Sequence, residues 1–281
     1  MPARRATLTF FPLTVSRSQL MAALLIIASV NGLAPFAIDS VTLEGWEDAI
    51  FKTFNVSVIV WGASVSACYL ALHADDINPV RRPDLIIACL MLLIIALPMT
   101  LLSWLSLSVL SAYAYWISPK HSLLRRSAII FFAMCVPMLW GPILFAVAQL
   151  PLLNIDAFLV GALIGTKHDG NLVSFVDGIH SMQIWASCSS FHNISQAALA
   201  WVALSQTLGR GFAVEDIFWG GLAVALAAGV NLVRLCLMAV SPEYFQAIHG
   251  PMGAQFAGGL TIVLIAFVCI VGQRRELFAH A

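Results

Sequence analysis

The sequence predicts an all-α polytopic membrane protein with about eight transmembrane helices and one short extracytoplasmic β-hairpin. Hydrophobic residues make up 60% of the 281 residues and charged residues only 10%, whereas an average soluble domain carries about 25% charged residues. The apolar residues gather in runs close to the length of about 20 residues that crosses a bilayer as a helix. Basic residues concentrate in alternate connections between these runs. Together these features indicate one integral membrane domain over residues 1–281.

The apolar runs define the expected helices. They lie near 19–36, 54–72, 85–97, 99–117, 127–150, 186–207, 217–239 and 254–272. The first run lacks a small-x-small cleavage site before the acidic segment that follows it, so it is expected to remain as a helix. The stretch from Leu85 to Trp116 is too long for one crossing, since at about 1.5 Å per residue it exceeds a hydrocarbon core of about 30 Å. Pro98 is the expected break between two shorter helices.

The distribution of positive charge supports this count. With a cytoplasmic N-terminus and eight crossings, the outer segments hold three of the 14 basic residues, which are Lys52, Lys167 and Arg234. The cytoplasmic segments hold the others: Arg4, Arg5, Arg17, Arg81, Arg82, Lys120, Arg125, Arg126, Arg210, Arg274 and Arg275. An excess of Lys and Arg on the cytoplasmic side is the rule for membrane proteins. We therefore expect a multi-pass protein of the cell inner membrane with both termini in the cytoplasm.

Two outer connections carry structural signals. Residues 37–53 mix acidic residues with Trp46 and Phe51, a composition typical of a short helix at the membrane interface. The longest connection is the extracytoplasmic loop 151–185. Its part from 171 to 185 reads as two β-prone runs around an Asp-Gly turn, which predicts a hairpin. Such a hairpin either is purely structural or holds an extended peptide at its edge by strand addition.

The cysteines separate into five ordinary residues and one distinctive residue. No pair forms a CxxC motif, and no Cys/His spacing is typical of a metal site. Five of the six lie inside apolar runs and are interpreted as small hydrophobic side chains: Cys68, Cys89, Cys135, Cys236 and Cys269. Cys188 differs because it opens an apolar run within the sequence Ala-Ser-Cys-Ser-Ser. The net charge of zero and the lack of Lys/Arg runs longer than two residues argue against nucleic acid as a partner.

Three polar groups on the predicted extracytoplasmic face form a candidate catalytic site: Cys188, Arg234 and His249. A thiol with a pKa near 8.5 needs a nearby cation, a base or a helix N-terminus to become a nucleophilic thiolate. Arg234 and His249 supply a cation and a base, and the helix that Cys188 opens would offer backbone N–H groups to an oxyanion. Asn231, three residues before Arg234, could orient the guanidinium. Arg234 could instead simply snorkel to the surface, and His249 could be an ordinary loop residue.

Other residues allow competing interpretations of this region. His192 stands four residues after Cys188, so on one helix the two would share a face, with His192 as a base, a supporting partner or a structural residue. A metal site built from His168, His180 and His192 is conceivable, although no HxxxH or HExxH spacing supports it. Ser189 or Ser190 as the nucleophile of an intramembrane serine peptidase would lack the Gly-x-Ser-x-Gly context.

The order and spacing of these motifs resemble the exosortase/archaeosortase family of membrane-embedded cysteine transpeptidases. The resemblance covers mainly residues 165–260: the stretch from Gly165 to Asp177 with its hairpin, the pair Cys188-Ser189, the motif Asn231-x-x-Arg234, and His249 followed by Gly253. Family members often carry glycine after the Cys-Ser pair, where this chain has Ser190.

The resemblance implies a function. Cys188 would be the nucleophile of a cysteine peptidase or transpeptidase, with Arg234 and His249 completing the triad and no cofactor or metal required. The substrates would be membrane-anchored exported proteins with a C-terminal sorting signal, made of a short motif, a transmembrane helix and a basic tail, as in PEP-CTERM proteins. The alternative is a non-catalytic membrane carrier, or an accessory protein of polysaccharide export, in which Arg234 binds an anionic group.

Overall fold

The computed structural model describes residues 15–74, 78–97, 99–209 and 213–274, and most of these residues are helical. The α-helices of the described residues are α1 (Arg17–Glu44), α2 (Trp46–Phe51), α3 (Val58–Leu72), α4 (Arg82–Ile95), α5 (Thr100–Ile117), α6 (Leu123–Cys135), α7 (Gly141–Ile164), α8 (Ser190–Thr207), α9 (Val214–Met238), α10 (Pro242–His249) and α11 (Pro251–Gly272). In this part of the chain, five helices are long and apolar enough to cross a bilayer, with α6 and α7 counted as one continuous helix. The chain thus has the character of an all-α membrane protein.

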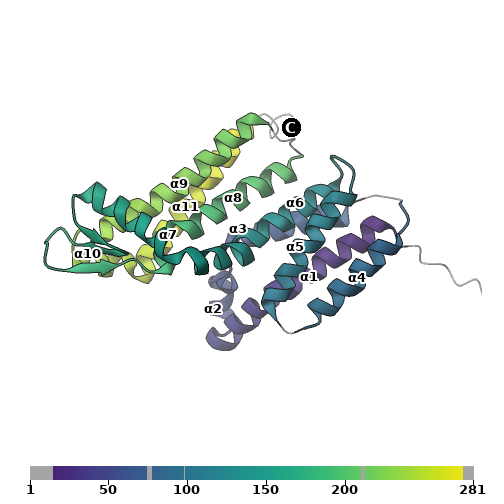
Figure 1. Cartoon of the computed structure of the whole chain (residues 1–281), viewed down its shortest axis with the longest axis horizontal. Coiled ribbons are helices and arrows are strands. Elements are labelled where there is room, and N and C mark those ends of the chain that lie inside the picture. Colours follow the sequence, from purple (N-terminus) through teal and green to yellow (C-terminus); the bar gives the residue numbers. More distant parts are fainter. Residues whose placement is uncertain (1–14, 75–77, 98, 210–212, 275–281) are drawn as a thin grey trace, which may run out of the picture.

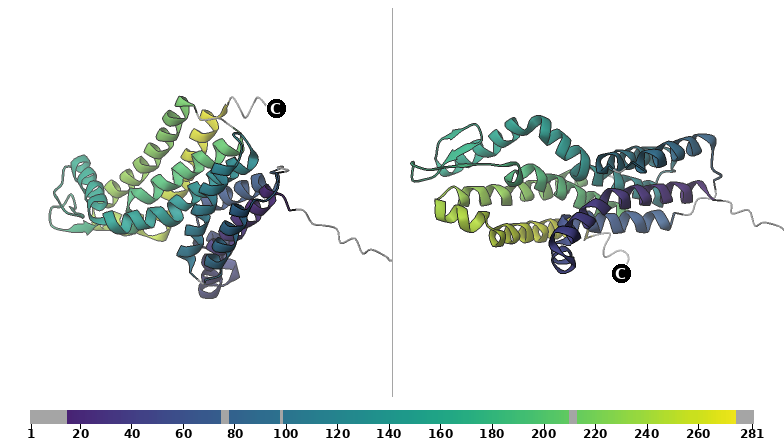
Figure 2. Two further views of the ribbon diagram at one scale, coloured as in Figure 1. Left: turned by 45° about the vertical axis from the view of Figure 1, so that its right-hand side comes forward. Right: turned by 90° about the horizontal axis from the view of Figure 1, so that it is seen from below.

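The remaining elements are short. They are the 3₁₀ turns η1 (Thr53–Asn55) and η3 (Ala186–Cys188), the π-helical turn η2 (Val136–Trp140), and the strands β1 (His168–Asp169), β2 (Leu172–Ser174) and β3 (Ser181–Gln183). Helices α1, α4, α5 and α6 form one side of the molecule, and α7, α9, α10 and α11 form the other side together with the strands (Figure 1). A second view shows that the strands lie at one extremity of an elongated molecule (Figure 2).

A buried ion pair joins the first part of the chain at one end. Arg17, the first residue of α1, donates to Asp84 of α4 across 2.7 Å, and Tyr113 near the end of α5 donates to the same carboxylate oxygen across 2.5 Å. The Asp84 side chain is fully buried, which is tolerated because it is paired and hydrogen-bonded. The starts of α1 and α4 and the end of α5 therefore lie together.

Two further contacts bring the ends of α8 and α11 to the start of α6. Arg126 in the first turn of α6 donates to the carbonyl groups of Gln206 (2.6 Å) and Thr207 (2.8 Å), which satisfies acceptors that the C-terminus of α8 leaves without intrahelical partners. Gln273, just after α11, donates to Ser205 of α8 across 2.8 Å. We call the side that carries Arg17 and Arg126 the basic end of the molecule.

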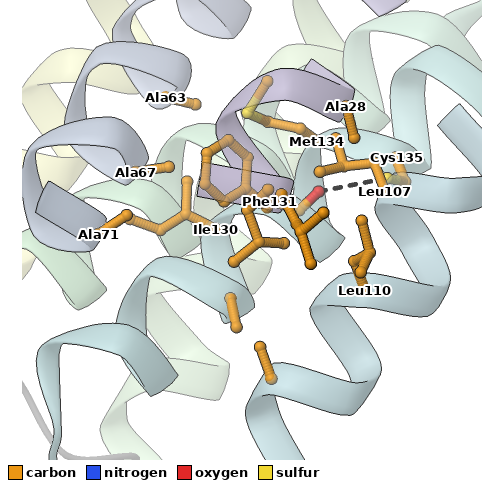
Figure 3. Packing of buried hydrophobic residues seen from close by; sticks show 14 of the residues in the cluster. Ala28, Ala63, Ala67, Ala71, Leu107, Leu110, Ile130, Phe131, Met134 and Cys135 are labelled. Atoms are coloured by element: carbon orange, nitrogen blue, oxygen red, sulfur yellow. Dashed lines mark hydrogen bonds between the residues drawn. The ribbon is translucent and has the colours of Figure 1, made fainter. Parts of the chain in front are cut away.

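Small residues allow the helices of the largest core to pack closely. Ala63, Ala67 and Ala71 recur at intervals of four residues on α3 and lie against Phe131 and other large side chains of α6 (Figure 3). Such alanine-lined faces let helix backbones approach each other. This core lies away from Cys188, which belongs to a separate buried cluster with residues of α7, the strands and α9. Among the cysteines interpreted as packing residues, Cys135 and Cys269 are buried, Cys68 and Cys236 are half-buried, and Cys89 is exposed.

The loop predicted to begin at residue 151 is helical as far as Ile164, so this part of the prediction was wrong. The helix bends at Ala148 (φ −108°, ψ 20°), three residues before Pro151, and continues. It continues because Leu153, Ala157 and Val160 recur at helical spacing and are all buried. A left-handed glycine, Gly165 (φ +74°), ends it. The predicted break at Pro98 lies outside the described residues; α4 ends at Ile95 and α5 begins at Thr100.

The π-helical turn η2 links α6 to α7. A π-helical turn inserts one extra residue into a helix. Gly141 follows the turn, and a side chain there would meet the carbonyl oxygen of Val136 at 2.8 Å, so only glycine fits without a backbone shift. Through this turn, α7 reaches the strands and the start of α8.

The strands form an antiparallel sheet in the order β1-β2-β3. Val173 pairs with Met182, and both side chains are buried. The turn between β2 and β3 is closed by Asp177, which accepts from the backbone N–H groups of Ile179 and His180. The hydrogen bond with the His180 side chain lowers the pKa of Asp177 to about 2, so its negative charge persists at all pH values above that.

Candidate active site

Cys188 lies at the end of the 3₁₀ turn η3, two residues before the first residue of α8. Its backbone N–H donates to the Trp185 carbonyl group across 2.9 Å. Ser189 is the N-cap of α8 in an extended conformation (φ −68°, ψ 141°), and its hydroxyl accepts from the N–H of Phe191. A serine cap of this kind stabilises a helix by about 1 kcal/mol. Cys188 is thus held in the connection before α8, with only 4% of its surface exposed.

His249 approaches Cys188 from a different part of the chain. Its Nδ1 lies 3.8 Å from the Cys188 Sγ, a hydrogen-bonding distance for sulfur, and which atom donates depends on the imidazole tautomer. His249 is the last residue of α10, whose start is capped by Ser241. The imidazole stacks on the Phe245 ring with 5.0 Å between ring centroids and 9° between ring planes. Stacking therefore fixes the orientation of the imidazole, while its exposed surface leaves it open to a reactant.

Asn231 of α9 supports the backbone at Cys188. Its side-chain amide donates to the Cys188 carbonyl group across 2.8 Å and to the Ser190 hydroxyl across 3.0 Å. The residue is buried, with 3% of its surface exposed. The sequence pointed to Asn231 as a partner of Arg234, whereas these two hydrogen bonds give it a role at the chain around Cys188. Only the Oδ1 of this amide could serve Arg234, because a guanidinium donates hydrogen bonds and accepts none.

Asp156 of α7 is a part of this site that reasoning from the sequence missed. Its carboxylate Oδ2 accepts from the Ser189 hydroxyl across 3.0 Å and from the Ser190 N–H across 3.1 Å. A signal for it was present, because an aspartate inside the apolar sequence Leu-Asn-Ile-Asp-Ala-Phe-Leu is costly in a membrane-spanning helix and usually functional. The predicted helix ended at residue 150, which placed Asp156 in an extracytoplasmic loop, where an aspartate is ordinary.

Three backbone N–H groups at the start of α8 are already used. Ser190 donates to Asp156, Phe191 donates to Ser189, and the N–H of Ser189 donates to the carbonyl group of Ala186 across 3.2 Å. These three groups are therefore not free to bind an oxyanion, although the sequence predicted that this helix start would offer such groups.

Arg234 lies one helical turn after Asn231 on α9 and is half-buried. Its Nε is buried and has no hydrogen-bond acceptor among the residues that the structure describes. The side chain lines a groove of about 560 Å³ between α9 and α11, whose other walls are apolar and include Val233, Ile248 and Phe256. Ile248 is the neighbour of His249. The structure thus brings His249 and Asn231 each into contact with Cys188 and places Arg234 in an adjacent groove, where its Nε has no acceptor among the described residues.

His192 does not share a helical face with Cys188, because Cys188 precedes α8. It is exposed and lines a separate pocket of about 160 Å³ together with Phe145, Phe191 and Ser195. The serine alternative is also disfavoured by geometry. Ser189 is buried, donates to Asp156 and accepts from Phe191, so its hydroxyl is committed to the fold.

The three histidines of the conceivable metal site contact different neighbours. His180 pairs with Asp177 across 2.7 Å, and the His168 ring packs edge-on against Phe158 at 5.6 Å. Within the described ranges, no three His, Cys, Asp or Glu side chains gather in an arrangement that could hold a metal ion.

Comparison with known proteins assigns no family: no protein-family model, curated protein or solved structure matches the chain. The site itself combines a buried thiol, an exposed imidazole beside it and a guanidinium in the adjacent groove, which are groups capable of acyl transfer through a thioester.

Proposed function

We propose that this chain is a membrane-embedded cysteine peptidase or transpeptidase of the exosortase/archaeosortase type. It cleaves the C-terminal sorting signal of membrane-anchored exported proteins. The observation that carries the proposal is the distance of 3.8 Å between Cys188 Sγ and His249 Nδ1, two residues 61 positions apart in the sequence. A nucleophile within hydrogen-bonding reach of a base is the geometric signature of covalent catalysis.

The reaction follows from the groups in place. His249 takes the proton of the Cys188 thiol, and the thiolate attacks the scissile carbonyl carbon. The bond to the leaving amine breaks as His249 returns the proton to that amine, which leaves the acyl group on sulfur as a thioester. An amine or a water molecule then attacks the thioester carbon, the carbon–sulfur bond breaks, and the proton that the attacking group gives up passes through His249 to the sulfur, which restores the thiol. Arg234 stabilises the oxyanion of each tetrahedral intermediate, because it lies one helical turn after Asn231 on α9 and its Nε has an unused donor.

A trapped intermediate tests this proposal. We expect a tagged membrane protein with a PEP-CTERM-type sorting signal to form a covalent adduct with the enzyme that hydroxylamine cleaves, because hydroxylamine attacks thioesters. The adduct is measured on denaturing gels and located by mass spectrometry, and Cys188→Ala serves as the control. A complete lack of adduct, with the substrate still processed, would remove the thioester mechanism.

The non-catalytic alternative has one observation in its favour. The apolar groove with a single guanidinium, Arg234, would suit a carrier that binds an anionic group with an apolar tail. Such a carrier would need no base beside Cys188. The same adduct experiment separates the two functions, because a carrier or an accessory protein of polysaccharide export forms no thioester.

The proposed topology has eight crossings, with the candidate site on the extracytoplasmic side of the cell inner membrane and both termini in the cytoplasm. The basic end supports it, since Arg17 and Arg126 lie there with the helix ends that flank Lys120. Cys188 precedes the N-terminus of α8, whereas the C-terminus of α8 lies at the basic end. In the proposed topology, Cys188 therefore lies on the extracytoplasmic side. The short helix α2, with exposed Trp46 and Phe51, would then rest at the outer membrane interface.

Reporter fusions check the topology. We expect alkaline phosphatase fused after Gly178 to be active, because that turn lies outside, and the same enzyme fused after Lys120 to be inactive, because that connection lies inside. A green fluorescent protein fused at the two positions should give the opposite pattern. Activity at Lys120 combined with inactivity at Gly178 would invert the orientation and remove the site from the outer face.

Arg234→Lys tests the role of the guanidinium. Lysine keeps the charge but loses Nε and the planar fork that can hold two oxygens at once. We expect the variant to insert normally and to turn over about tenfold more slowly, the equivalent of one hydrogen bond to a charged group. Cleavage is measured at matched expression levels. A turnover equal to that of the native enzyme would assign Arg234 to snorkelling alone.

A further inference from the structure

Asp156 is a buried carboxylate that no ion pair among the described residues neutralises. It is 5% exposed, and the ion pairs of the described chain involve other acids. Its Oδ2 accepts two hydrogen bonds, from the Ser189 hydroxyl (3.0 Å) and from the Ser190 N–H (3.1 Å). Burying a carboxylate within an apolar helix is costly, so the contacts that it makes need an explanation.

The two residues that Asp156 holds follow Cys188 directly. From α9, Asn231 donates to the Cys188 carbonyl group and to the Ser190 hydroxyl. The stretch from Cys188 to Ser190 thus forms hydrogen bonds with one side chain from α7 and one from α9. Ser189 is extended there, between the 3₁₀ turn and α8. A change in the backbone dihedral angles of Ser189 would change the direction of the Cys188 side chain relative to α8.

We infer that Asp156 is a positioning residue, which aims the Cys188 thiol at His249 by anchoring the start of α8. This inference rests on the proposed function. Asp156 makes its two hydrogen bonds to Ser189 and Ser190, and acts through the backbone at Cys188. The same two bonds stabilise α8, so a positioning role has to be distinguished from simple stabilisation.

The coupling between the thiol and the imidazole, measured as the effect of His249→Ala on the alkylation rate of Cys188, distinguishes the two roles. Purified full-length protein is treated with iodoacetamide, and the rate of alkylation at Cys188 is measured by mass spectrometry. In the native background, His249→Ala should slow this rate, because the base no longer helps to form the thiolate. In an Asp156→Ala background, the effect of His249→Ala should be lost, since the thiol no longer faces the imidazole. Turnover of Asp156→Ala itself should fall by about 100-fold, because a displacement of a catalytic group by about 1 Å is enough for such a loss.

Three further variants complete the test. Asp156→Asn keeps an oxygen that can accept both hydrogen bonds, so it should restore the coupling to the native level. Ser189→Ala removes one of the two bonds, together with the cap on the Phe191 N–H, and should give an intermediate loss, which keeps the test available if Asp156→Ala does not fold. Asp216→Ala is the matched control: Asp216 is also a buried carboxylate that accepts from the backbone ahead of a helix, but at the start of α9. It should lower thermal stability and leave the coupling intact.

The outcomes separate the inference from the proposed function. If the native protein shows no effect of His249→Ala on Cys188, the thiol and imidazole do not cooperate, and both the proposed function and this inference fail. If the native coupling is present and persists undiminished in folded Asp156→Ala, or in Ser189→Ala, Asp156 has no positioning role while the proposed function stands.

Discussion

Replacing Cys188 with alanine is expected to abolish cleavage of the sorting signal and leave the protein folded. The thiol is the only group proposed to bond covalently to the substrate, so its loss removes the thioester route entirely. The side chain is small, and a change to alanine takes away little volume from its buried cluster. Cleavage of a tagged substrate in membranes, together with the thermal stability of the purified variant, measures both effects.

Three other cysteines serve as controls for this experiment. Cys68→Ala, Cys89→Ala and Cys269→Ala should process the substrate at nearly the native rate, because these residues lie in helices α3, α4 and α11, outside the buried cluster that contains Cys188. Cleavage that survives in Cys188→Ala would rule out the thiol mechanism. A loss of cleavage shared by all four variants would instead indicate a general effect on folding.

His249→Ala is expected to lower turnover by about 100-fold or more, the usual contribution of a positioned acid or base. The imidazole is the group beside the Cys188 sulfur, at 3.8 Å. His192→Ala should retain turnover close to the native level, since His192 lines a separate pocket. Both variants are compared in the same cleavage experiment at matched expression. An inactive His192→Ala beside an active His249→Ala would show that the base is His192 and not His249.

Composition and periodicity were sufficient for the class of fold and most of its helices. Apolar runs of membrane-spanning length made α1, α5, α9 and α11 predictable, because such runs have no alternative in a bilayer. The end of α7 was not predictable in the same way. The apolar run was expected to end at residue 150, but the helix bends at Ala148, passes Pro151 and stays helical because tertiary packing buries Leu153 and Val160.

The site was predictable as a set of residue types and only partly as a geometry. The sequence identified Cys188 and His249 as candidates. Their proximity depends on α10, a short helix that is capped by Ser241 and that no apolar run predicts. Asn231 was noticed for its distance from Arg234 along the helix, whereas its contacts run to Cys188 and Ser190. Contacts between segments far apart in the sequence decided its role, and local spacing carries no information about them.

The π-helical turn η2 changes the rotational phase of the helix that follows it. Each residue of an α-helix advances the chain by roughly 100° around the axis, so the one extra residue of η2 turns α7 by that amount relative to α6. Asp156 lies four turns or so beyond η2, as an α-helix has about 3.6 residues per turn, and η2 and the bend at Ala148 together set the phase at which it faces Ser189 and Ser190. A turn far from Cys188 in the sequence thereby helps to determine which face of α7 meets the start of α8.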